Sequence, residues 1–210
     1  MAVITGIRLL RGVVTLQADG LDWIKLRKED FSRWPLSEGD AIDPDEYTDR
    51  IAAAQMKDAC EAALTLLESS EKTRAQLREK LLQKGFVPAA AEAAVERAAQ
   101  YRFVDDRRYA KRLAEVQAAQ NTGVYALRRK LRQKGVSEED AEEAVAALDD
   151  DQQKKACAEV FRKIAYRYAG LPAREAKGKA SQALARRGFA WDIISSVLEN
   201  AFSDTDTDED

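Results

Sequence analysis

The pattern of apolar and polar positions changes character once along the chain, near residue 45. Between Val3 and Leu26 apolar residues alternate with polar ones, and Asp19-Gly20 supplies a turn, which predicts a β-hairpin or three short strands. A short helical or turn segment, closed by Pro35, follows over residues 28–34. From residue 45 to residue 202 the apolar positions recur at helical spacing. The chain is therefore expected to be mainly α-helical, with a small β segment within residues 1–50.

Within the helical part, the same helix ending occurs three times. The segments 77–86, 127–136 and 180–189 align, so that Gly85, Gly135 and Gly188 recur at intervals of 50 and 53 residues. Glycine can adopt the left-handed conformation that closes a helix, and a basic residue precedes each of the three, where it suits the negative helix end. A recurrence at nearly constant spacing indicates a repeat protein.

Each repeat is expected to contain three helices. One helix precedes each aligned segment, over residues 56–67, 107–119 and 152–168, and another follows each glycine. The predicted repeats span residues 51–104, 105–150 and 151–202. Two capping-box patterns, at 73–76 and 137–140, mark helix starts. Because a unit of this size buries little apolar surface alone, the repeats are expected to stack into an elongated, curved array.

The composition argues against catalysis. The chain has no histidine, which excludes His-dependent metal sites and Ser-His or Cys-His nucleophiles, and it has neither of the common glycine-rich phosphate loops. The two cysteines, Cys60 and Cys157, lie in separate apolar helical contexts and are predicted to be core residues. We therefore expect no enzyme activity, cofactor or metal. Without a secretory or membrane-spanning segment, the protein is predicted to be cytoplasmic and to make no membrane contact.

Charge is distributed in blocks that the net charge of −3 conceals. Residues 71–135 carry 16 basic and 7 acidic side chains, and residues 152–202 carry 10 and 4. Residues 136–151 carry 8 acidic side chains and no basic ones. The acidic, low-complexity tail over 203–210 is predicted to be disordered. The two basic blocks are either solvated helix faces or sites that attract an anionic partner.

The middle repeat concentrates the exposed arginines. If Leu127 and Leu131 face inward, Arg128, Arg129 and Arg132 point outward and Lys130 lies on the flank. Arginine binds phosphates and carboxylates in a bidentate manner, so the target could be nucleic acid or an acidic protein surface. The predicted partner-binding residues are Arg128, Arg129, Lys130, Arg132, Lys134, Arg78, Lys80 and Tyr125.

Six aromatic residues lie near the basic blocks. Tyr125, beside Gly123, is expected to be exposed in a connecting turn, where it could stack on a base. Core packing is the expectation for most of the others, which are Tyr101, Phe103, Tyr109, Tyr166 and Tyr168.

These segments resemble the RecX family of recombinase regulators. The resemblance rests on the L-x-x-K-L-x-x-K-G-[FV] segments at 77–86 and 127–136, the link Tyr101-Arg-Phe-Val-Asp-Asp-Arg-Arg-Tyr-Ala110, and the closing segment 185–189. The β start followed by Leu36-Ser-Glu-Gly-Asp40 is similar to an N-terminal extension of some members. The third repeat departs from the pattern, with Ala180 and Ala183 in place of Leu and Lys.

The resemblance implies a monomeric regulator that lodges in the groove of a RecA filament on DNA. It would inhibit ATP hydrolysis and strand exchange in DNA repair, homologous recombination and the SOS response, and it could contact single- or double-stranded DNA. Two alternatives remain open from the residues alone. The chain could be a stand-alone nucleic-acid-binding helical module, or a helical-repeat adaptor for another acidic partner.

Overall fold

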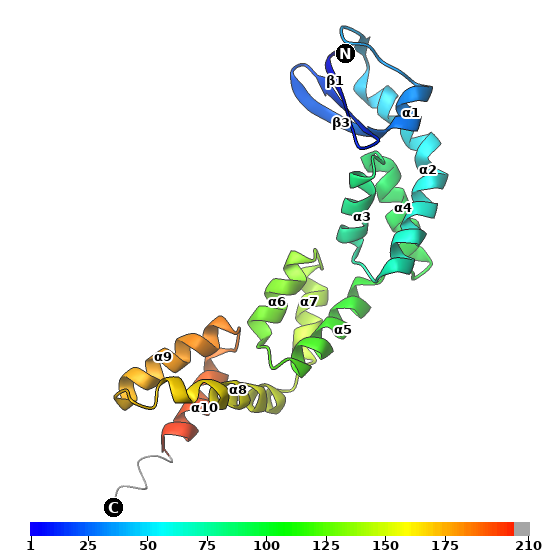
Figure 1. Cartoon of the computed structure of the whole chain (residues 1–210). Helices are drawn as coiled ribbons and strands as arrows, with labels where there is room; N and C mark the ends of the chain where they lie inside the picture. The colour runs from blue at the N-terminus through cyan, green and yellow to red at the C-terminus, as the bar shows by residue number, and fades with distance from the viewer. Residues whose placement is uncertain (204–210) are drawn as a thin grey trace, which may run out of the picture. The chain divides into compact units, whose positions relative to one another are not determined.

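The chain divides into two compact units, Met1–Asp105 and Asp106–Asp210. The computed structural model describes residues 1–203, so all of the predicted acidic tail except Ser203 lies outside the described residues. Ser203 itself is the last residue of a helix rather than part of a tail. Figure 1 shows a small sheet followed by helices, as the apolar pattern predicts.

The first unit begins with an antiparallel sheet. Its strands are β1 (Ala2–Leu10), β2 (Val13–Ala18), β3 (Leu21–Arg27) and β4 (Ala41–Ile42), in the order β3-β2-β1-β4. Both hairpin turns place two consecutive residues at positive φ, as at Asp19 (φ 50°) and Gly20 (φ 84°), which matches the right-handed twist of the strands. Of the two predicted alternatives, a hairpin or three short strands, the structure shows the second, and the three strands form a meander. The fourth strand was not predicted, because only two of its residues pair with β1.

The first three-helix repeat packs against this sheet. After α1 (Lys28–Arg33) come α2 (Pro44–Ser69), α3 (Arg74–Gln83) and α4 (Pro88–Gln100). Helix α2 starts well before the predicted residue 56, because Pro44 occupies its first turn and the Asp43 carboxylate accepts from two backbone amides there. Alternate residues of β2 and β3 join the helices in one apolar core, through Val14, Leu16 and Leu26.

A buried glutamine connects the sheet segment to the first repeat. The Gln55 amide nitrogen donates to Asp30 Oδ2 (2.7 Å) and to the Gly85 carbonyl (3.1 Å), and its oxygen accepts from Val87 N (2.7 Å). Asp30 is itself held by Arg27 (2.6 Å). Buried polar groups are tolerated where they are hydrogen-bonded, so this network fixes how the repeat meets the sheet.

The second unit contains the other two repeats. The second repeat consists of α5 (Asp106–Ala119), α6 (Val124–Gln133) and α7 (Glu138–Ala146). The third consists of α8 (Asp150–Ile164), the short 3-10 helix η1 (Ala165–Arg167), α9 (Ala173–Arg186) and α10 (Trp191–Ser203). Each has its own apolar core, around Leu127 and Leu131 in one and around Leu184 and Phe189 in the other.

Backbone contacts join the second and third repeats. Gly123 N donates to the Arg187 carbonyl (3.2 Å), and Tyr125 N donates to the Gly188 carbonyl (2.9 Å). A Cβ on Gly188 would lie 2.4 Å from Ala126 N, and one on Gly123 would lie 2.2 Å from the Gly188 carbonyl carbon. The turn after α9 therefore rests directly on the start of α6, and both positions require glycine.

Candidate partner-binding surface

Helix α6 carries the main cluster of predicted binding residues. Leu127 and Leu131 are fully buried in the core of the second repeat, which turns the opposite side of the helix to solvent. The helix ends at Gln133, and Gly135 follows the Lys134 cap with a φ of 74° that closes the last turn. This orientation confirms the buried leucine stripe from which the exposed face was predicted.

The exposed face of α6 presents cations that have no acidic partner. Arg129 and Arg132 are exposed, and Lys130 is half-buried beside them. Within residues 1–203, none of these three side chains forms an ion pair, whereas Lys134 at the helix end is half-buried and already engaged. Unpaired guanidinium groups keep all their donors available, so this face can bind carboxylates or phosphates. We call Arg129, Lys130 and Arg132 the basic face.

Arg128 is not part of this exposed face, contrary to the prediction. Its side chain is 29% exposed, and its Nη2 donates to Glu142 Oε2 of α7 at 2.6 Å. Its guanidinium also lies over the Tyr125 ring, 5.7 Å from the centroid, and its Nε is buried with no hydrogen-bond acceptor among residues 1–203. The prediction considered α6 alone. The acidic helix α7 packs beside it and attracts the nearest arginine.

Tyr125 is exposed, as predicted, but it lies in the first turn of α6 rather than in a connecting turn. Its backbone amide binds the Gly188 carbonyl at 2.9 Å, so the backbone is held while the ring faces solvent beside Arg128.

The predicted residues of the first repeat form a different arrangement. Arg78 of α3 is half-buried, and its Nε donates to Glu92 of α4 at 2.6 Å. Lys80 is exposed and donates to Gln83 at 3.1 Å. The Arg78–Glu92 pair occupies the same repeat positions as Arg128–Glu142, whereas serines occupy both positions in the third repeat. We conclude that each of these paired arginines links two helices of its own repeat through an ion pair.

The expectation that most nearby aromatic residues are core residues is wrong for three of them. Tyr101, Phe103 and Tyr166 are exposed, and the rings of Tyr101 and Phe103 lie 6.3 Å apart in the link after α4. Tyr109 and Tyr168 pack against the cores of the second and third repeats as expected. Helical spacing could not predict that the first three residues are exposed. Residues 101 and 103 follow the end of α4, and Tyr166 lies in a single 3-10 turn.

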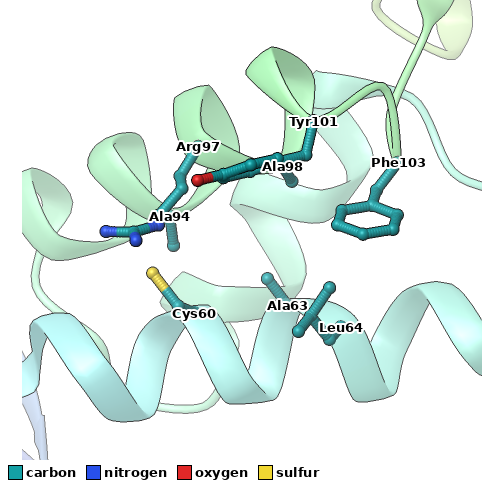
Figure 2. A pocket seen from close by; sticks show the side chains of 8 residues that line it. All are labelled: Cys60, Ala63, Leu64, Ala94, Arg97, Ala98, Tyr101 and Phe103. Carbon is teal, nitrogen blue, oxygen red and sulfur yellow. The ribbon is translucent and has the colours of Figure 1, made fainter.

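An apolar pocket in the first unit was not predicted. It lies between α2 and α4 and is lined by Cys60, Ala63, Leu64, Ala94, Arg97, Ala98, Tyr101 and Phe103 (Figure 2). Cys60, expected in the core, is half-buried and lines this pocket, whereas Cys157 is fully buried as expected. Burial raises the pKa of the Cys157 thiol to about 11. The signal in the sequence was the pair of aromatic residues flanking Arg102, just past a helix end.

Acidic residues of α7 form ion pairs with several basic side chains of neighbouring helices. Glu143 accepts from Arg107 and Lys111 of α5, and these contacts lower the pKa of its carboxyl group. Over residues 1–203, the side chains form no cluster of three or more groups able to hold a metal ion. In the same range, no helix combines the length and apolar character needed to cross a bilayer.

The fold and this surface define a helical repeat protein built from three tandem three-helix domains behind a small β segment. Three family models match the chain one after another. They are the first, second and third three-helix domains of RecX, at residues 59–97, 105–145 and 150–198. Together they match more than half of the chain. The chain therefore belongs to the RecX family.

Relatives carry the name "Regulatory protein RecX". The protein from Trichlorobacter lovleyi is 35% identical over 153 residues, which cover 69% of this chain and 96% of the relative. The protein from Vibrio parahaemolyticus is 32% identical over 148 residues, which cover 70% and 92%. For the relative from Clostridium tetani, identity is 31% and the match spans 63% of its length.

Two solved structures share the fold. A crystal structure of regulatory protein RecX matches with a TM-score of 0.66 and 21% identity, covering 95% of this chain and all of the other. A crystal structure of RecX from Lactobacillus salivarius matches with a TM-score of 0.67 and 23% identity, covering 70% and 97%. The chain is accordingly a member of a family of regulatory proteins.

Proposed function

We propose that this protein binds the RecA recombinase filament on DNA and inhibits its ATPase and strand-exchange activities in DNA repair and recombination. Membership of the RecX family and the name of its relatives support this function. The structural observation that carries it is the basic face of α6, where Arg129 and Arg132 are exposed, Lys130 is half-buried, and none of the three has an acidic partner within residues 1–203. Water hydrates these cations in the free protein, and an external carboxylate or phosphate surface can replace that water with charge-assisted hydrogen bonds.

The mode of action is occupancy rather than chemistry. Arg129 and Arg132 are three residues apart on one helix, so their guanidinium groups lie on neighbouring turns of the same face. Each can form a bidentate contact with a carboxylate of a filament protomer or with a phosphate of its DNA. A helix held at two such points would obstruct the rearrangements that accompany ATP turnover. We expect the protein to act as a monomer.

The test is ATP turnover by RecA on single-stranded DNA. The wild-type chain should depress turnover in a concentration-dependent way, and no effect at a saturating concentration would remove this function. Arg129→Glu combined with Arg132→Glu should raise the inhibitory concentration at least about tenfold, because two charge-assisted contacts are lost. Arg11→Glu with Lys28→Glu is the matched control, since both residues are exposed cations of the sheet segment. This control should inhibit like the wild type.

A second candidate function, direct binding of single-stranded nucleic acid, is favoured by the exposed Tyr125 ring, which lies on the same helix as the basic face, four residues before Arg129. Aromatic rings stack on bases, and cations neutralise phosphates. If about three cations contact phosphates, the logarithm of the binding constant should fall with the logarithm of salt concentration with a slope of roughly −2. Fluorescence anisotropy of a labelled oligonucleotide at several salt concentrations measures this slope. A binding constant that does not change with salt would exclude this candidate while leaving the filament-binding proposal intact.

A further inference from the structure

The pocket between α2 and α4 has small residues at its base and large ones at its mouth. Alanines 63, 94 and 98 are buried and line its base, while Leu64, Tyr101 and Phe103 stand around the opening (Figure 2). Its volume is about 230 Å³. Because small molecules usually occupy pockets of ~300–1,000 Å³, this one is better matched to a single large side chain.

The mouth exposes more apolar surface than the fold requires. Tyr101 is 64% exposed, Phe103 54% and Leu64 40%. An exposed large apolar residue is ordinary when isolated, but three gathered around one concave site mark a place where another surface binds. In Figure 2 the Cys60 sulfur points from α2 towards α4, so the apolar lining continues across the pocket floor.

One cation at the rim completes the site. Arg97 is exposed, and its side chain has no ion pair or hydrogen bond within residues 1–203. The acidic residues of the same helix are already used, because Glu92 pairs with Arg78 (2.6 Å) and Glu96 lies 3.4 Å from Arg74. Arg97 is therefore free to receive a carboxylate from outside, directly beside the apolar opening.

We propose that this pocket anchors one large apolar side chain of a protein partner, with an acidic residue next to it that pairs with Arg97. The inference rests on the proposed function, because it adds a second contact to the partner bound by the basic face. Protein interfaces concentrate their binding energy where an apolar anchor fills a pocket and charged groups surround it. A nucleobase fits the site less well, because its edge needs several hydrogen-bond partners and the lining is mostly carbon and sulfur, with the Tyr101 hydroxyl and the Arg97 guanidinium as its polar side-chain groups.

Cys60 provides a probe of occupancy inside the pocket. It is half-buried in the lining, whereas Cys157 is fully buried and its thiol has a pKa raised to about 11 by burial. Iodoacetamide should therefore alkylate Cys60 in the folded protein and spare Cys157. Mass spectrometry of the peptides gives the rate at each site. Saturating RecA filament should slow alkylation of Cys60 at least about tenfold, while an unchanged rate alongside intact inhibition would overturn the proposal.

The same assay separates the classes of partner. Single-stranded DNA alone should leave the alkylation rate of Cys60 unchanged. If the oligonucleotide by itself protects Cys60, the pocket is a nucleic-acid site and the proposal is wrong. If protection depends on the concentration of this protein alone, the pocket is covered by a second copy, and the proposal is again wrong.

Variants of the rim provide an independent readout. Phe103→Ala and Arg97→Glu should each raise the concentration needed for half-inhibition of RecA about tenfold, and Phe103→Leu should retain most of the inhibition. Tyr166→Ala, at an exposed aromatic residue of the third repeat, is the matched control and should have no effect. Urea denaturation checks that each variant is folded. Wild-type inhibition with unaffected rim variants would sink this inference alone, whereas absence of wild-type inhibition would sink the proposed function and this inference together.

Discussion

At the residue scale, the environment of each arginine separates structural from available cations. Arg78 and Arg128 bind glutamates of the next helix in their own repeats at 2.6 Å. Arg129 and Arg132 stay exposed and unpaired within residues 1–203. A partner that recruits Arg128 must first compete with Glu142, whereas Arg129 offers its donors at no such cost.

The Arg128–Glu142 pair should make a small contribution to stability. Arg128→Glu places two carboxylates side by side and is expected to lower the free energy of unfolding by about 1–2 kcal/mol. In a double-mutant cycle with alanine at both positions, the coupling should be about 0.5–1 kcal/mol. Urea denaturation followed by circular dichroism measures both. Arg129→Glu is the control, and a loss as large as that of Arg128→Glu would contradict this assignment.

Cys157 should make stability fall in alkaline solution. Its pKa is raised from 9.0 in the unfolded chain to about 11 in the folded one. The folded state therefore keeps the thiol proton over a pH range in which the unfolded state loses it. Stability is full below pH 9 and declines as pH rises towards 11, by about 1–2 kcal/mol from this group. Urea midpoints of the wild type and Cys157→Ala at pH 8 and pH 10.5 test it, and parallel declines would contradict it.

At the element scale, the first and second repeats stop their middle helices with the same local signal, whereas the signals that start these helices differ. The Thr73 hydroxyl accepts from Gln76 N while the Gln76 side chain binds Thr73 N, a complete capping box at the start of α3. At helix ends the carbonyl of residue 81 accepts from Phe86 N (3.2 Å), and Leu131 and Val136 repeat this bond at 3.1 Å. These bonds satisfy groups that a helix end leaves open, so short-range sequence alone locates the boundaries.

Removal of the capping hydroxyl should weaken the first repeat. Thr73→Ala leaves an amide of the first turn of α3 without its acceptor in a fully buried position. We expect a loss of about 1–2 kcal/mol in unfolding free energy, and Thr73→Ser should recover most of it. Chemical denaturation of the three proteins provides the comparison, and an equal loss for serine would show that the methyl group matters rather than the hydroxyl.

At the scale of the whole molecule, stability depends on how neighbouring modules meet. Gln55 and Asp30 hold the sheet segment to the first repeat in one unit. In the other unit, the turn at Gly188 rests on the start of α6. Since each repeat is small, such contacts between neighbours add to the stability that the core of each repeat provides.

A methyl group at Gly188 should separate the second and third repeats. Gly188→Ala strains a residue at φ 85° and pushes a Cβ to 2.4 Å from Ala126 N. We expect a loss of at least about 2 kcal/mol. Gly178→Ala is the matched control, because that glycine lies inside α9 with nothing near its Cβ. It should stabilise the protein by up to about 1 kcal/mol. Thermal unfolding compares the two, and an equal effect would refute the contact.

The sequence alone determined the helical character of the chain, the glycine-closed helix ends, the three repeats and the buried leucine stripes, because helix periodicity and glycine turns depend on residues only a few positions apart. It also located the basic face to within one helix. Only the tertiary structure decided that Arg128 turns to Glu142 and that Cys60 and Arg97 line one pocket. Those outcomes depend on pairs of residues 14 or more positions apart, which meet only after the helices pack.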